Sequence, residues 1–154
     1  MAKQLKYDVA TVLERGTQAT IEDWYNHVEE EPNLVAIPLS LEQRCAHLPE
    51  IFRDLVQRLR KPLPLGSHAL VSTAAADHGR LRRDQGYTAA MMVEESRMLQ
   101  VSIFQTLQAN VEDIEPGVLL KHVMAIADEV DSQLAQAMAN YIVEAKVDKQ
   151  PIKP

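Results

Sequence analysis

The stretch 77-DHGRLRRDQGYT-88 decides the fold, because it specifies the end of one helix, a turn and the start of a second helix. Gly86 stands where the residue after a last helical turn commonly takes a left-handed conformation, which glycine adopts without steric cost. Thr88 is a good N-terminal cap, since its hydroxyl can accept a hydrogen bond from a backbone N–H of the next helix. The sequence therefore predicts a helical hairpin here.

Helical periodicity extends on both sides of this turn. Small residues recur at helical spacing before it and lead to His78, which places His78 at or near a helix contact, with Gly79 beside it allowing a close backbone approach. After the turn, Glu95 interrupts an apolar stripe. A buried carboxylate is costly unless it is paired, so we expect Glu95 to meet a partner across the hairpin. The candidate partners are His78, Arg82 and Arg83.

Further helices are predicted on either side of the hairpin, and each has a start or stop signal. The expected order is a short helix from Leu5 to Gly16, a helix capped by Thr20 and stopped by Pro32, a helix after Ser40, a helix from Pro49 to Arg60, a loop at residues 62–66, a helix capped by Ser67, the hairpin, and a long helix from Pro116. Each segment has one apolar face, so all belong to one core.

The expected fold class is therefore all-α, a single compact domain of about six helices. Either a globin-like fold or a helical bundle fits, with residues 1–147 forming the domain and residues 148–154 a tail or the start of a linker. The long C-terminal helix has a heptad seam that predicts either a core helix or a dimer contact. The seam residues are Val123, Ala127, Val130, Leu134, Ala137 and Tyr141.

Composition excludes several classes of protein. A net charge of −6 argues against nucleic-acid binding, which requires a basic face. Cys45 is the only cysteine, so no intramolecular disulfide is possible, and a packed thiol in a reducing, cytoplasmic compartment is expected. The N-terminal ten residues have no apolar signal region, and no window is apolar enough to span a membrane.

No catalytic constellation is present in the sequence. A phosphate-binding loop, a nucleophile elbow and the Glu-x-x-His pairs of a di-iron site are all missing. Glu94 and Glu95 are adjacent and diverge on a helix, which does not suit paired general acid and base catalysis. We therefore expect no enzyme, no catalytic residue, no metal and no cofactor. Haem stays open as an alternative, because His78 and His122 each lie on a predicted helix with apolar neighbours.

A family resemblance is carried by the block His78-Gly-Arg-Leu-Arg-Arg-Asp-Gln-Gly-Tyr87, followed by Glu95-x-Arg97-x-Leu99. This block resembles the N-terminal domain of RsbRD-type RsbT co-antagonists, and similar domains precede bacterial histidine kinases. One departure is Gln100, where the family pattern often has an arginine. The residues that match the family motif and that we expect to form its polar cluster are His78, Gly79, Arg80, Arg82, Arg83, Gln85, Gly86, Tyr87, Glu95 and Arg97.

The resemblance implies an all-α input domain of a bacterial stress-response or two-component pathway, globin-like and without haem. Such domains are thought to dimerise and to pass a signal through their last helix to an output domain. The function expected for this chain is therefore non-enzymatic signalling through a homodimer and a contact with an output partner. The alternative is a globin-like sensor that binds a small ligand or haem.

Overall fold

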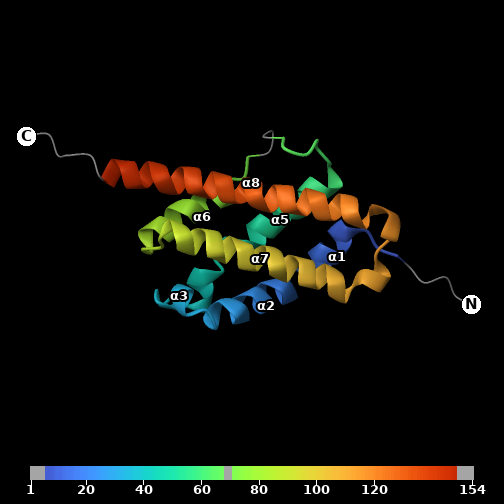
Figure 1. The fold of residues 1–154 in the computed structure, drawn as a ribbon, viewed down its shortest axis with the longest axis horizontal. Coiled ribbons are helices and arrows are strands. Elements are labelled where there is room, and N and C mark those ends of the chain that lie inside the picture. Colours follow the sequence, from blue (N-terminus) through green and yellow to red (C-terminus); the bar gives the residue numbers. More distant parts are fainter. Residues whose placement is uncertain (1–5, 68–70, 149–154) are drawn as a thin grey trace, which may run out of the picture.

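Six helices of seven residues or more build the described part of the chain, which is residues 6–67 and 71–148 of a computed structural model (Figure 1). They are α1 (Val9–Arg15), α2 (Thr17–Glu29), α5 (Leu48–Arg60), α6 (Thr73–Asp84), α7 (Ala89–Ala109) and α8 (Pro116–Asp148). Shorter pieces complete the order: α3 (Pro32–Val35), α4 (Leu41–Arg44) and the 3₁₀ turn η1 (Val111–Asp113). The expected all-α class and the long C-terminal helix are confirmed.

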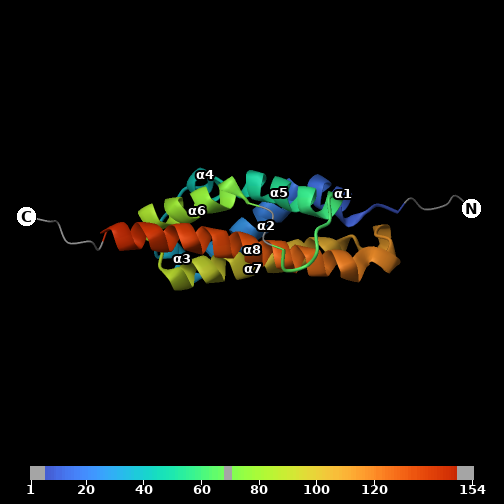
Figure 2. The ribbon, with the colours of Figure 1, turned by 90° about the horizontal axis from the view of Figure 1, so that it is seen from above.

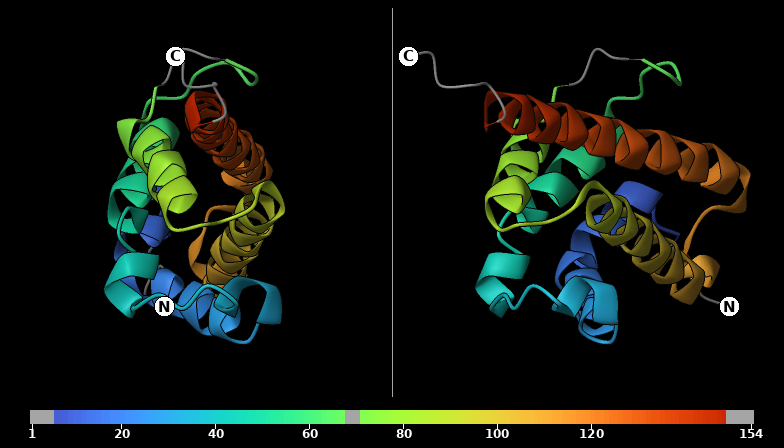
Figure 3. Two further views of the ribbon diagram at one scale, coloured as in Figure 1. Left: turned by 90° about the vertical axis from the view of Figure 1, so that its left-hand side faces the viewer. Right: turned by 60° about the vertical axis from the view of Figure 1, so that its left-hand side comes forward.

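The helices surround one core. Viewed along the long axis, α6 and α8 lie at the top, α7 lies on the right, α2 and α3 lie below, and α4 and α5 lie on the left (Figure 3). The long helices α7 and α8 are joined by a short connection at one end, and together they cover one side of the molecule (Figure 2). Within the described ranges the only extended pairing is an isolated bridge between Tyr7 and Ile114. None of the described helices combines the length and the apolar character needed to cross a membrane.

The hairpin between α6 and α7 has the local chemistry that the sequence predicts. Gly86 has a φ of +93°, the left-handed conformation that other residues rarely adopt. The Thr88 hydroxyl accepts a hydrogen bond from the Met91 amide at 3.2 Å and caps α7. The local conformation at this corner therefore follows from two residues, Gly86 and Thr88.

Other predicted boundaries are confirmed where the signal is local. Gly16 ends α1, Ser40 caps α4 in a capping box with Gln43, and Pro49 lies in the first turn of α5. Pro116 begins α8. Proline is tolerated in a first turn because the N–H that it lacks would have no partner there.

Three predicted boundaries are wrong. Thr20 lies inside α2, which begins at Thr17, and its hydroxyl donates to the Gly16 carbonyl at 2.7 Å. Pro32 does not stop α2, which has ended at Glu29, and instead begins α3. Ser67 does not cap α6. Ser72 does, by accepting from the Ala75 amide at 3.1 Å.

Two predictions fall partly outside the described residues. Leu5 was expected in the first helix, and the tail at residues 148–154 begins at the last residue of α8. Leu5 and residues 149–154 lie outside the described ranges. The first described helix, α1, begins at Val9, with Asp8 as its cap.

The heptad seam of α8 faces mainly inward. Val130 and Ala137 are buried within the chain, and the other four seam residues are partly buried against the core or on its edge. Ala137 packs directly on Gly79 of α6, where an added Cβ would lie only 2.0 Å from the Ala137 carbonyl oxygen. Val130 and Ala137 therefore pack in the core of the chain, and neither is accessible to a partner in this structure.

Candidate functional site

A group of buried and partly buried polar side chains lies where α6, α7, α4 and the hairpin turn meet. We call this group the buried cluster, and its members are Arg44, His78, Arg82, Gln85, Tyr87 and Glu95. Helix α6 supplies His78 and Arg82 one turn apart, so that both project toward the first two turns of α7. Tyr87 comes from the turn and Arg44 from the last position of α4. Four separate segments thus contribute to one site.

Glu95 lies at the centre of the buried cluster and is 4% exposed. Its Oε1 accepts a hydrogen bond from Arg82 Nε at 2.9 Å and lies 3.0 Å from His78 Nε2. Burial alone would raise the pKa of this carboxyl, but the His78 hydrogen bond and the Arg82 charge outweigh it, so the pKa of Glu95 lies below its ordinary value. The pairing of Glu95 across the hairpin is present as the sequence predicts, with His78 and Arg82 as the partners.

Arg82 is fully buried, and every nitrogen of its guanidinium has a partner. Besides Glu95, it donates to Gln85 Oε1 at 2.7 Å, to the Arg44 carbonyl at 2.6 Å and to the Gln43 carbonyl at 3.4 Å. The guanidinium also lies 4.7 Å from the centre of the Tyr87 ring. Because a buried charge is tolerated only when it is paired and hydrogen-bonded, these contacts fix α4 and the turn onto α6.

Arg44 is a second buried arginine that the sequence analysis missed. It is 1% exposed, and it donates to Tyr87 Oη at 2.6 Å and to the Ile37 carbonyl at 2.9 Å. Its Nε lies 3.5 Å from Glu29 Oε1. Nothing in the local spacing distinguishes this arginine from an exposed one at a helix C-terminus, where basic residues are common.

Tyr87 joins the buried cluster to α8. Its backbone carbonyl accepts a hydrogen bond from Tyr141 Oη at 2.8 Å, and the Arg83 guanidinium lies 5.8 Å from the Tyr141 ring. Burial and the neighbouring Glu95 carboxylate raise the pKa of the Tyr87 phenol well above its ordinary value, with Arg82 opposing. One residue of the predicted seam, Tyr141, is thus a contact between the last helix and the turn.

The remaining motif residues lie apart from the buried cluster. Arg80 pairs with Asp77 and donates to Asn140 Oδ1 at 3.0 Å, and Arg97 pairs with Glu94 at 2.6 Å on the surface of α7. Gly79 has a packing role, against Ala137. Five of the ten motif residues therefore lie in the buried cluster and five lie outside it, where Gly79 is buried against α8.

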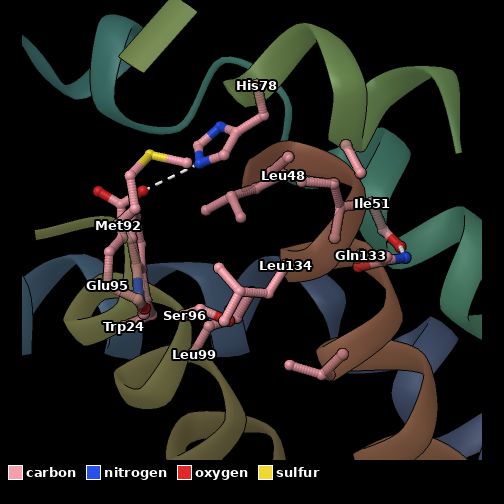
Figure 4. Close-up of a pocket in the computed structure, with 13 residues that line it drawn as sticks. Trp24, Leu48, Ile51, His78, Met92, Glu95, Ser96, Leu99, Gln133 and Leu134 are labelled. Carbon is pink, nitrogen blue, oxygen red and sulfur yellow. Dashed lines mark hydrogen bonds and ion pairs between the residues drawn. The ribbon is translucent and has the colours of Figure 1, made fainter. Parts of the chain in front are cut away.

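A small cavity of about 40 Å³ lies beside the buried cluster (Figure 4). His78 and Glu95 lie on one side, with the hydrogen bond between them drawn, and Gln133 of α8 lies on the opposite side. Most of the lining is apolar, including Trp24, which donates from Nε1 to the Glu95 carbonyl at 3.2 Å. Side chains from α2, α5, α6, α7 and α8 all line this space.

His78 and His122, the two candidate haem ligands, do not meet at this cavity. His78 Nε2 is already engaged by Glu95, and the imidazole of His47 lies edge-on to the His78 ring, with 5.9 Å between ring centres. Burial and the nearby His78 lower the pKa of His47. His122 is on α8 and does not line the cavity. In residues 6–67 and 71–148, no three His, Cys, Asp or Glu side chains are placed to hold a metal ion.

Comparison with protein-family models, with curated proteins and with solved structures found no match. The resemblance described above therefore rests on the motif residues themselves, and the geometry of the buried cluster is the main guide to function.

Proposed function

We propose that this chain is a non-enzymatic input domain of a bacterial stress-response or two-component pathway, acting in the cytoplasm through a homodimer and a contact with an output partner. The observation that carries the proposal is that five motif residues, which come from α6, the turn and α7, meet in the buried cluster. These residues are His78, Arg82, Gln85, Tyr87 and Glu95.

The chemistry of the buried cluster favours recognition and structure over catalysis. Glu95 has a lowered pKa, which keeps its carboxyl ionised and unsuited to act as a general acid near neutral pH. Arg82 donates four hydrogen bonds to protein groups and is fully buried, so its guanidinium is not exposed to a substrate. Both features suit a cluster that holds α6, α7 and the turn in a fixed arrangement and does not react with a substrate.

A path from the buried cluster to the last helix is present in the contacts. Arg82 packs on Tyr87, and the Tyr87 carbonyl accepts from Tyr141 on α8. A change at the hairpin would therefore alter a direct hydrogen bond to α8, the helix that the resemblance makes the route to the output partner. The exposed apolar side chains of α8, Leu120, Met124 and Ile142, are available for a second copy or a partner.

The experiment that tests the proposal compares Arg82→Ala with Arg97→Ala. Both are motif arginines, but Arg82 is fully buried whereas Arg97 is 61% exposed and pairs only locally with Glu94. Sedimentation velocity from low to high micromolar concentration should show a dimer for the natural chain and for Arg97→Ala. Arg82→Ala should lower both the melting temperature and the dimer fraction. A natural chain that stays monomeric at high micromolar concentration contradicts the dimer.

The second candidate function, binding of a small ligand, is favoured by the cavity beside His78 and Glu95. Its volume of about 40 Å³ exceeds the space one water needs but is far below the roughly 300–1,000 Å³ of pockets for larger ligands. A molecule of a few atoms fits and haem does not. Xenon is the probe: methyl shifts of Leu48, Ile51 and Leu99 under xenon pressure would support the cavity, and unchanged shifts would exclude it.

A further inference from the structure

A second group of buried charges lies between α5 and α8, away from the buried cluster. Its centre is Arg58 of α5, which is 3% exposed. Arg58 donates to the Leu63 carbonyl at 3.0 Å and to Asp128 Oδ2 at 3.3 Å, and Asp128 Oδ2 also accepts from the Gly66 amide at 3.1 Å. This group ties the segment that follows α5 to the middle of α8.

Glu129, the neighbour of Asp128, is also buried but is less well compensated. It is 3% exposed, and its Oε2 lies 3.7 Å from Arg58 Nε, too far for a hydrogen bond. Its Oε1 accepts one hydrogen bond, from Gln133 Nε2 at 3.3 Å, and the same nitrogen also donates to the Ile51 carbonyl at 3.3 Å. An ionised carboxylate at this depth normally needs more partners.

The charges that face Glu129 come from both helices and from the segment after α5. Asp54 and Arg58 face it from α5, and Asp128 lies beside it on α8. The exposed Lys61 lines the same hollow of about 220 Å³ as Glu129 and Asp54. Asp128 and Glu129 therefore share one buried guanidinium, and Asp54 adds a third negative charge near Glu129.

The hydrogen bonds decide which carboxylate holds a proton. Asp128 lies closer to the Arg58 guanidinium than Glu129 does, at 3.3 Å against 3.7 Å, and it also accepts from the Gly66 amide. Asp54 Oδ2 accepts from the Ser72 hydroxyl at 2.6 Å. Glu129 has only the shared Gln133 amide. Burial raises the pKa of Glu129 to about 7, with Arg58 and Gln133 opposing and Asp54 and Asp128 adding to the rise.

We propose that Glu129 is a proton-binding switch in the contact between α5 and α8. In the protonated form it packs as a neutral side chain beside Arg58. In the ionised form it carries an under-compensated buried charge and weakens the hold of α8 on α5. Because α8 also carries the Tyr141 contact to the turn, proton release at Glu129 would loosen the helix that reaches the buried cluster. This pH response is a property of the fold and does not require the chain to be a signalling domain.

The direction of the pH effect follows from the two states. The pKa of Glu129 is about 7 in the folded chain, against an ordinary value of 4.5. The folded state therefore binds the proton more tightly than the unfolded state, so this group contributes stability that is fully present below about pH 4.5 and is lost as the pH rises through about 7. His47 and His122 have lowered pKa values and act in the opposite direction below about pH 6.5, so a difference between variants is needed to isolate Glu129.

The experiment measures urea unfolding of the full chain, Glu129→Gln and Asp131→Asn from pH 6 to pH 8. Asp131→Asn is the matched control, because it removes an exposed carboxylate from the same helix. The ratio of the unfolding constant of the natural chain to that of Glu129→Gln should rise about tenfold between pH 6 and pH 8. The same ratio taken against Asp131→Asn should stay constant.

A direct titration completes the test. The Glu129 carboxyl carbon, assigned by through-bond correlation to its own backbone amide, should shift with a midpoint near pH 7 in carbon NMR of the folded natural chain. A midpoint below pH 5, or an unfolding difference that is flat from pH 6 to pH 8, would overturn the proposal. The NMR arm decides the matter even if the glutamine variant unfolds.

Discussion

Replacing Gly79 with alanine should destabilise the fold strongly, although alanine is the better helix former. The added Cβ would lie 2.0 Å from the Ala137 carbonyl oxygen and 2.7 Å from its carbon, whereas real Cβ contacts are essentially never under 3.0 Å. Because both clashing atoms belong to the backbone of α8, no side-chain rotation relieves the overlap. Helices α6 and α8 would have to separate by about 1 Å at a contact where interiors are close-packed.

The magnitude follows from two opposing effects. Overpacking of this kind costs about 1–3 kcal/mol and occasionally more, and the backbone clash places Gly79→Ala at the upper end. The helix propensity of alanine returns about 1 kcal/mol. We expect a net loss of about 2 kcal/mol, which is a fall of about 4–8 °C in melting temperature for a chain of this size.

The assay is thermal and guanidinium unfolding followed by circular dichroism, with Gly117→Ala as the control. A Cβ at Gly117, in the first turn of α8, would meet only Glu115 Oε1 at 3.9 Å, so this variant should be neutral or slightly more stable. Equal stability of the two alanine variants would refute the close contact between α6 and α8.

Two further changes test the hairpin and its link to α8. Gly86→Ala has steric room, since the nearest atom is Ile37 Cδ1 at 3.7 Å, but forces alanine to a φ of +93°, so it should cost about 1–2 kcal/mol in guanidinium unfolding. Gly86→Asn should cost less, and an asparagine variant no better than alanine would contradict the left-handed turn. Tyr141→Phe removes the donor to the Tyr87 carbonyl at 2.8 Å and should cost about 1 kcal/mol in the same assay, whereas unchanged stability would mean that this hydrogen bond contributes nothing.

The features that the sequence predicts correctly are those decided by a few neighbouring residues. Gly86 and Thr88 act within one turn of the chain, so the hairpin follows from their identities. The pairing of Glu95 was predictable for a related reason, because a carboxylate on an apolar helical stripe must find a donor wherever the stripe is buried.

The features that it misses depend on tertiary structure. Ser67 and Ser72 are equally good caps by composition, and the choice of Ser72 depends on tertiary contacts. Its hydroxyl donates to the Asp54 carboxylate and its amide donates to the Gln136 amide oxygen, each at 2.6 Å. Thr20 resembles a cap because acidic residues follow it, yet its hydroxyl lies 2.6 Å from Thr106 Oγ1 of α7 in the middle of a helix packing interface. A serine or threonine near a helix start is compatible with either role.

The heptad seam of α8 shows the same ambiguity at the scale of a helix. A spacing of three and four residues serves an internal core as well as a coiled coil, because both need one apolar face. Gly79 decides the case for Ala137, since only glycine lets α6 come close enough to cover that position. Arg44 could not be foreseen, because its burial depends on where α4 docks and not on its neighbours in sequence.

Trp24 gives this chain a built-in optical reporter. It is the only tryptophan, it is 1% exposed, and its indole N–H is bound to the Glu95 carbonyl beside the cavity. All indole emission therefore comes from one apolar location next to the buried cluster. Binding in the cavity, loss of the Glu95 contacts or opening of α2 from α7 should each change the emission wavelength or intensity of this one fluorophore, so events at the site can be followed in the natural chain without a label.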